Sequence, residues 1–204
     1  MSRFLRPVTP LVLAVLFLAS GWVGGPNNAV DVGIVDALAA IRQAHPALEM
    51  LASWLTFLGS GYVTFGLALS GAICLSLRRR SREAALLLLG LVGERFAMDG
   101  LKLLYARARP PFDLHPTAID SFSFPSGHTS NSMTAFVLFA LYVVPEHQRK
   151  TALAVAIPLA VAIGFTRPFL GVHWPSDVVG GWCLAGVAIW TVMTIERRFS
   201  SVPA

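Results

Sequence analysis

Three clusters of polar residues in this chain combine residue types and spacings that could hold and transfer a phosphate group. The first cluster contains Lys102 and, after six intervening residues, the pair Arg109-Pro110. Both cations come at the end of an apolar run, where a bilayer excludes charge at a cost of about 3 kcal/mol unless an anion compensates. Cations that only anchor a span at the membrane surface would give the same pattern, so both interpretations stay open for this cluster alone.

The second cluster is the segment Phe124–Thr129, which opens an apolar run. Ser126 is placed to cap a helix, and Gly127 allows an anion to approach the backbone closely. The N-terminus of a helix offers unpaired N–H groups and a favourable dipole, which makes it a natural seat for phosphate. His128 would then stand in the first turn beside that phosphate, although an ordinary capped helix would also explain the pattern.

The third cluster runs from Thr166-Arg167 through His173 to Asp177. Pro175 suits the first turn of a helix, which places His173 just before the helix and Asp177 within its reach. A carboxylate bonded to one ring nitrogen leaves the other nitrogen free to attack, and an arginine supplies a planar fork for phosphate oxygens. Together the three clusters predict a phosphoryl-transfer site with no metal and no cofactor.

Composition places this chemistry in a membrane. The 204 residues suit one domain over 1–204, 55% of them are hydrophobic and only 13% are charged. The net charge of +5 comes from short basic clusters between apolar runs and not from a basic patch with aromatics, so no nucleic-acid partner is expected. Cys74 and Cys183 lie inside apolar runs, where a free cysteine packs as a small hydrophobe.

We expect an all-α, polytopic membrane protein with six transmembrane helices. The apolar runs that predict them cover residues 8–25, 57–77, 84–105, 128–145, 151–167 and 177–195. Between the first two, the stretch Asn27–Trp54 alternates charged and apolar residues at helical spacing, which predicts a helix lying along the membrane interface. The first run, preceded by Arg3 and Arg6, could instead be a signal peptide.

Basic residues are unevenly divided between the two faces that six spans would create. Ten of the sixteen lie on the face that holds both ends of the chain: Arg3, Arg6, Arg78, Arg79, Arg80, Arg82, Arg149, Lys150, Arg197 and Arg198. The positive-inside rule therefore puts both termini in the cytoplasm and the three polar clusters on the outer face of the cell (inner) membrane. In the outer loop, Arg107 and His115 are expected to be solvated, while Arg95 and Asp99 should form an ion pair within the third span.

The three motifs, KxxxxxxRP at 102–110, PSGH at 125–128 and TRxxxxxHxxxD at 166–177, resemble those of the type-2 phosphatidic-acid phosphatase (lipid phosphate phosphatase) family. One departure is Thr166, where the family usually has serine, and it retains the hydroxyl group. The resemblance implies that His173 is a nucleophile that forms a phosphohistidine, that Asp177 orients it and that His128 is the general acid. It also implies a phosphate-binding set, which is Lys102, Arg109, Ser126, Gly127 and Arg167.

The resemblance implies a membrane lipid phosphate as substrate, and more than one lipid is consistent with it. An isoprenoid diphosphate such as undecaprenyl diphosphate is favoured, because an outward-facing site matches the recycling of a carrier released there. Phosphatidylglycerophosphate and phosphatidic acid are the alternatives. A transporter that only holds a lipid head group is a further possibility, but binding alone would need cations and not a His–Asp pair. The oligomeric state is left open.

Overall fold

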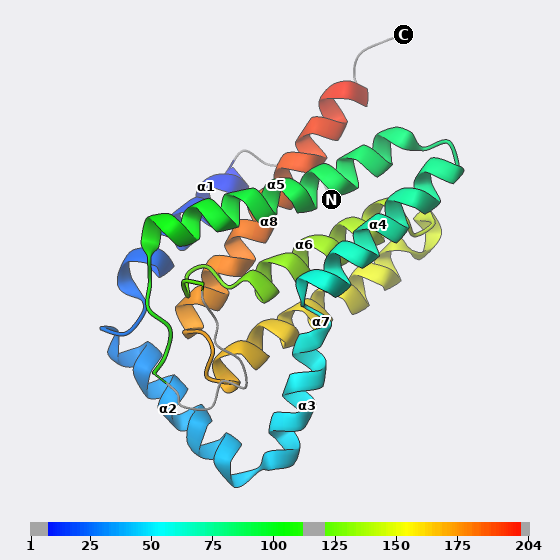
Figure 1. Ribbon diagram of the computed structural model, residues 1–204. Helices are drawn as coiled ribbons and strands as arrows, with labels where there is room; N and C mark the ends of the chain where they lie inside the picture. The colour runs from blue at the N-terminus through cyan, green and yellow to red at the C-terminus, as the bar shows by residue number, and fades with distance from the viewer. Residues whose placement is uncertain (1–7, 112–120, 201–204) are drawn as a thin grey trace.

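The computed structural model describes residues 8–111 and 121–200, and these residues form helices and loops with no strand. Figure 1 shows the helices in chain order: α1 Val8–Val23, α2 Ala29–Ala44, α3 Pro46–Phe57, α4 Gly61–Leu77, α5 Ser81–Tyr105, α6 Gly127–Tyr142, the short 3-10 helix Glu146–Gln148, α7 Arg149–Phe169 and α8 Pro175–Ser200. Each of the six apolar runs therefore forms a helix close to its predicted bounds.

Three stretches of the described chain are long and apolar enough to cross a membrane by themselves. They are Pro46–Leu77, Glu146–Phe169 and Pro175–Phe199, and Val8–Val23 is a shorter apolar helix. Many large hydrophobic side chains on these helices face outward, among them Leu11, Leu69 and Val155. A surface of this kind is stable in lipid, where helices also satisfy their own backbone hydrogen bonds.

The stretch between the first two apolar runs folds differently from the single helix that its pattern predicted. It forms two helices, α2 and α3, which meet at an angle at His45 (Figure 1). Pro46 begins α3, and steric contact with a proline ring disfavours helical backbone at the residue before it. His45 accordingly adopts φ −135° and ψ 75°, which ends α2.

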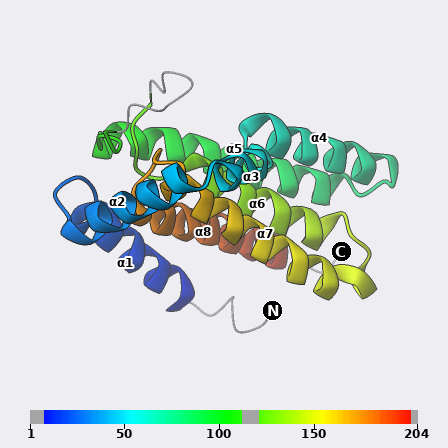
Figure 2. The ribbon, with the colours of Figure 1, turned by 90° about the horizontal axis from the view of Figure 1, so that it is seen from below.

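Helix α6 is the centre of the bundle. It packs against α4, α5, α7 and α8, and Figure 2 shows it between the α4–α5 pair and α7. Leu75, Leu87, Leu91 and Leu138 are completely or almost completely buried in the core around it. Helix α1 packs along α8, so the first apolar run is part of the same bundle.

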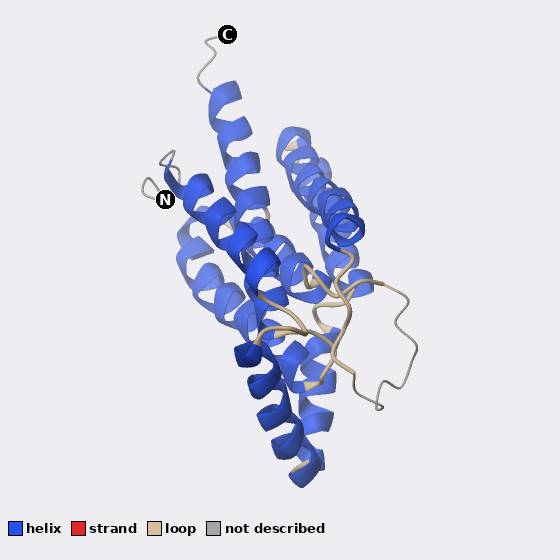
Figure 3. Cartoon of the chain, turned by 90° about the vertical axis from the view of Figure 1, so that its left-hand side faces the viewer, coloured by secondary structure: helices blue, strands red, loops and turns tan. Residues whose placement is uncertain are grey.

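The loops that follow α5 and α7 and the loop that enters α6 meet on one side of the bundle (Figure 3). Hydrogen bonds join them: the Ser123 N–H donates to the Arg107 carbonyl at 2.8 Å, and the indole of Trp174 donates to the Ala108 carbonyl at 2.9 Å. The three polar motifs of the sequence lie in or beside these loops. The helices thus bring segments about 70 residues apart to one place.

Close packing of α8 on the start of α6 predicts the effect of one substitution. A Cβ atom at Gly181 would lie 2.8 Å from the Ser126 carbonyl oxygen and 2.9 Å from Thr129 Cβ. Gly181→Ala should therefore push the two helices apart and lower stability by about 1–3 kcal/mol, measured as a lower Tm in detergent. Gly100→Ala is the control, because no atom lies within 4 Å of a Cβ there. Equal Tm values for the two variants would contradict the predicted contact.

Candidate active site

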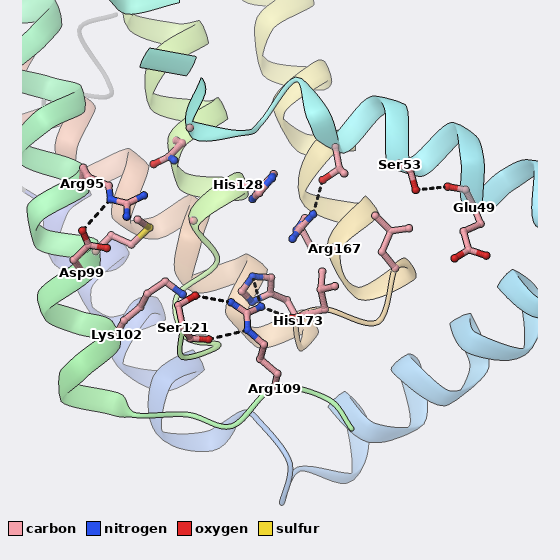
Figure 4. Close-up of a pocket in the computed structure, with 17 residues that line it drawn as sticks. Glu49, Ser53, Arg95, Asp99, Lys102, Arg109, Ser121, His128, Arg167 and His173 are labelled. Atoms are coloured by element: carbon pink, nitrogen blue, oxygen red, sulfur yellow. Dashed lines mark hydrogen bonds and ion pairs between the residues drawn. The ribbon is translucent and has the colours of Figure 1, made fainter. Parts of the chain in front are cut away.

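A cavity of about 540 Å³ opens where the three motifs meet (Figure 4). Six of the eight residues predicted for the site line it: Lys102, Arg109, Gly127, His128, Arg167 and His173. The other two, Ser126 and Asp177, are fully buried behind it. The described residues therefore gather all three motifs around one space.

His173 lies in the loop between α7 and α8 and is held by Asp177. Its Nδ1 is 3.2 Å from Asp177 Oδ2 and 3.3 Å from the hydroxyl of Ser123. The same carboxylate oxygen accepts hydrogen bonds from the Ser123 hydroxyl at 2.5 Å and from the Trp174 N–H at 2.9 Å. With Nδ1–H directed at the carboxylate, the lone pair of Nε2 is on the side of the cavity.

The charge state of His173 suits attack on phosphorus. Burial, followed by the positive charges of Arg109, Arg167 and Lys102, lowers the pKa of His173 well below its ordinary value. The imidazole is therefore neutral at pH 7, as a nucleophile must be. Nη1 of Arg109 is 3.2 Å from Nε2 and donates a hydrogen bond to the Val172 carbonyl at 2.6 Å, so a phosphate attacked by Nε2 would meet this guanidinium at once.

The remaining cations come from two helices. Lys102, in the last turn of α5, donates to the Phe122 carbonyl and is largely buried. Arg167, in the last turn of α7, donates from Nη1 to the hydroxyl of Thr56 on α3 at 2.7 Å. Figure 4 shows the guanidinium groups of Arg109 and Arg167 on either side of His173. Fixed cations around a cavity stabilise the charge that develops on a phosphoryl group during transfer.

The start of α6 differs in one detail from the prediction. Ser126 is the N-cap residue, but its side chain makes no capping bond and instead accepts a hydrogen bond from the Thr129 hydroxyl at 2.9 Å. The cap side chain therefore does not occupy the N–H groups of the first turn, which is the arrangement that an anion-binding helix N-terminus requires. Gly127 and His128 follow at the cavity wall, and the His128 ring points into the cavity (Figure 4).

Arg107 was expected to be solvated, and this expectation is wrong. Its side chain is buried and forms an ion pair with Asp177, with Nη1 at 2.7 Å from Oδ1. Nη2 donates to the carbonyls of Ser20 and Gly21 in the last turn of α1, at 2.9 and 2.5 Å. The physical hint in the sequence is indirect: a carboxylate as buried as Asp177 needs a cation, and nothing in the spacing says which one.

The role of Asp31 on α2 in supporting Ser176, at the start of α8, was also not predicted from the sequence. Its carboxylate is buried and accepts hydrogen bonds from the Gly25 N–H at 2.6 Å and from the Ser176 hydroxyl at 2.5 Å. Ser176 in turn accepts from Nη1 of Arg107 at 2.9 Å, so α2 supports the same residues.

His115 lies outside the described residues. In the described part of the chain no group of three His, Cys, Asp or Glu side chains is arranged to hold a metal ion.

Comparisons with known proteins identify the family of this chain. The model of the PAP2 superfamily matches residues 62–200. Phosphatidylglycerophosphatase B of Bacillus subtilis is 29% identical over 200 residues, covering 95% of this chain and 96% of that protein. An undecaprenyl-diphosphatase of Sulfolobus acidocaldarius is 27% identical over 96% of this chain and 93% of its own length.

A crystal structure shows the same architecture. The transmembrane PAP2-type phosphatidylglycerolphosphate phosphatase from Bacillus subtilis aligns with a TM-score of 0.85 and 28% identity, covering 95% of this chain and 98% of that one. Fold and site together define a membrane-embedded phosphatase. The chain belongs to the PAP2 superfamily, and it is a multi-pass membrane protein of the lipid-phosphatase class.

The Arg107–Asp177 ion pair generates a prediction about turnover. Arg107→Gln should lower kcat on the order of a hundredfold, because small displacements of a reacting group are that costly, while KM changes little since Arg107 does not line the cavity. Arg107→Lys, which keeps the charge, should restore part of kcat. Asp36→Asn, which changes an exposed carboxylate on α2, is the control and should leave kcat and KM unchanged. A rise in KM with kcat unchanged would contradict a positioning role. So would a kcat of Arg107→Lys as low as that of Arg107→Gln.

Proposed function

We propose that this protein hydrolyses the terminal phosphate of a membrane lipid phosphate or diphosphate through a phosphohistidine on His173. The observation that carries the proposal is the contact of His173 Nδ1 with the buried Asp177 carboxylate, which leaves Nε2 beside Arg109 at the cavity. Lys102, Arg109, Arg167 and the N-terminus of α6 with Ser126 and Gly127 would hold the phosphate oxygens.

The reaction would proceed in two steps. In the first, Nε2 of His173 attacks phosphorus, the bond from phosphorus to the bridging oxygen breaks, and His128 donates a proton to the departing lipid oxygen. In the second, His128 accepts a proton from water, and the resulting hydroxide attacks phosphorus and releases inorganic phosphate from His173. In-line displacement places the attacking atom and the leaving oxygen on opposite sides of phosphorus. His128 reaches the cavity from α6, and His173 reaches it from the loop after α7.

The membrane arrangement that suits this chemistry is a single domain over 1–204 with six spans. We assign the spans to α1, α4, α5, α6, α7 and α8, with α2 and α3 near the interface that carries the site. The basic-residue count then places both termini in the cytoplasm and the cavity on the outer face of the inner membrane.

Two lipid classes meet this description. An isoprenoid diphosphate such as undecaprenyl diphosphate is available to an outward-facing site after a carrier is released there, and phosphatidylglycerophosphate also carries a terminal phosphate on an apolar lipid. Relatives named for each activity match this chain over almost its whole length. The residues proposed for catalysis would contact the terminal phosphate and the oxygen that joins it to the lipid, so they fit both classes. A lipid head-group transporter would use the cations but would have no need of the His173–Asp177 contact.

Phosphate release tests the proposal directly. Purified protein in detergent micelles with EDTA should release inorganic phosphate from phosphatidylglycerophosphate, phosphatidic acid or undecaprenyl diphosphate, because the proposed mechanism uses only protein side chains. The measurement is free phosphate against time for each lipid. If no phosphate were released from any of the three lipids, the enzyme hypothesis would be wrong. If EDTA abolished phosphate release, the mechanism above would be excluded.

Substitution of the proposed nucleophile tests the intermediate. His173→Ala should lower kcat by at least about a thousandfold and should remove an acid-labile, base-stable phosphoenzyme that the wild type forms with ³²P-labelled lipid. His147→Ala, in the exposed turn at the opposite end of the bundle, is the control and should leave both unchanged. A labelled phosphoenzyme that survives in His173→Ala would contradict the assignment.

Labelling of single cysteines tests the proposed sidedness. In a chain with Cys74 and Cys183 replaced by alanine, Asn27→Cys should react with a membrane-impermeant maleimide added to intact cells, because this exposed loop follows α1 on the proposed outer side. Gln148→Cys, in the exposed turn before α7, should react only after the cells are permeabilised. The reverse pattern would place the cavity in the cytoplasm.

A further inference from the structure

The cavity extends beyond the groups that would hold the terminal phosphate. Its volume of about 540 Å³ lies in the range of sites that enclose a whole small ligand and is several times what one phosphate group needs. Arg95 and Asp99 on α5 line one end of it, and Glu49 and Ser53 on α3 line the opposite end, with His128 and Arg167 between the two ends (Figure 4). The proposed mechanism gives the polar residues at the two ends no role.

Arg95, Asp99 and Lys102 form one line along α5. Separations of three and four residues return to the same face of a helix, so the three side chains follow one another at one turn each. From Arg95 to Lys102 the backbone rises about 10 Å, with Asp99 between them. The cavity wall thus presents a cation, a carboxylate and a second cation in that order.

Arg95 and Asp99 are unusual as an ion pair within the bundle. Their side chains remain 46% and 48% exposed, although charge within a membrane helix is costly unless it faces a polar space. Nε of Arg95 donates to Asp99 Oδ2 at 2.9 Å, and among the described residues this is the one hydrogen bond that the Arg95 guanidinium makes. Its terminal nitrogens and the second oxygen of Asp99 therefore remain available to a ligand in the cavity.

The order of these groups matches one kind of lipid head group. Lys102 would meet the terminal phosphate, the carboxylate of Asp99 would accept a hydrogen bond from a hydroxyl group, and Arg95 would bind a second phosphate. In a diphosphate a single oxygen joins the two phosphorus atoms, so the second phosphate would stay beside Lys102. A three-carbon linker with a free hydroxyl places a second phosphate farther along α5.

We infer that Arg95 and Asp99 form a head-group subsite for a second phosphate that a hydroxyl-bearing linker separates from the phosphate removed. The inference rests on the proposed function for the place of the terminal phosphate. It selects a glycerophospholipid with a phosphodiester, in preference to an isoprenoid diphosphate, as the lipid that the whole cavity recognises.

The test compares three lipids in detergent micelles with the full chain. Arg95→Gln should raise KM for phosphatidylglycerophosphate about tenfold, the size of one charge-assisted hydrogen bond, with kcat nearly unchanged. KM for phosphatidic acid, which has no second phosphate, and for undecaprenyl diphosphate should change less than about twofold. Asp99→Asn should act on the same lipid in the same direction.

A matched control lies on the same helix. Arg80 and Glu83 also form an ion pair on α5, at 3.0 Å, but at the opposite end and away from the cavity. Arg80→Gln should leave KM unchanged for all three lipids. If Arg95→Gln raised KM for phosphatidic acid as much as for phosphatidylglycerophosphate, the Arg95–Asp99 ion pair would have only a structural role. That result would overturn the inference. A rise in KM for undecaprenyl diphosphate alone, or for both two-phosphate lipids, would overturn the assignment of the linker.

Binding without turnover separates this inference from the proposed function. In a His173→Ala background, the affinity for phosphatidylglycerophosphate and for phosphatidic acid can be measured by calorimetry in micelles. Adding Arg95→Gln should weaken only the first, by about tenfold. This result would support the subsite even if the wild type released no phosphate. An unchanged affinity for phosphatidylglycerophosphate after the second substitution would refute the subsite even if catalysis were normal.

Discussion

The carboxylate of Asp177 is the interaction on which the site depends. Removing a carboxylate from water costs several kcal/mol, so it is stable in the bundle only with a full set of partners. It has them: Arg107 on one oxygen, and Ser123, the Trp174 N–H and His173 on the other. These partners come from the loop after α5, the loop before α6 and the loop after α7. One buried charge thus holds together the three segments that carry the motifs.

The same network ties the site to the N-terminal helices. Arg107 donates to carbonyls at the end of α1, where the helix dipole favours a cation, and Asp31 of α2 accepts from the Ser176 hydroxyl beside it. The side of the cavity proposed to bind phosphate is built differently. There Arg109 and Arg167 bond to neutral oxygens, so their positive charge stays uncompensated by carboxylates and is available to an anion. The cation that pairs with Asp177 is therefore distinct from the cations that we propose to bind phosphate.

Much of the fold could be predicted because the bilayer limits the choices. An apolar run must form a helix that satisfies its own backbone, which is why α4 to α8 lie close to their predicted bounds. The interfacial stretch was harder, since its helical periodicity continues across Pro46 while the backbone does not. Ser126 is the N-cap residue, as predicted, but the sequence could not show that its side chain makes no capping bond. A serine that caps a helix and a serine that leaves the helix N-terminus open look the same in a sequence.

By itself, the sequence determined the helices, the spacing of the three motifs and the pairing of His173 with Asp177, because each of these follows from local geometry. It also predicted the ion pair of Arg95 with Asp99, which helical spacing brings within reach. Only the tertiary structure decided that Arg107 is buried against Asp177 and that the Arg95–Asp99 pair lines the cavity. Those outcomes depend on contacts between segments far apart in the chain, and a buried charge selects its partner by packing that no local pattern records.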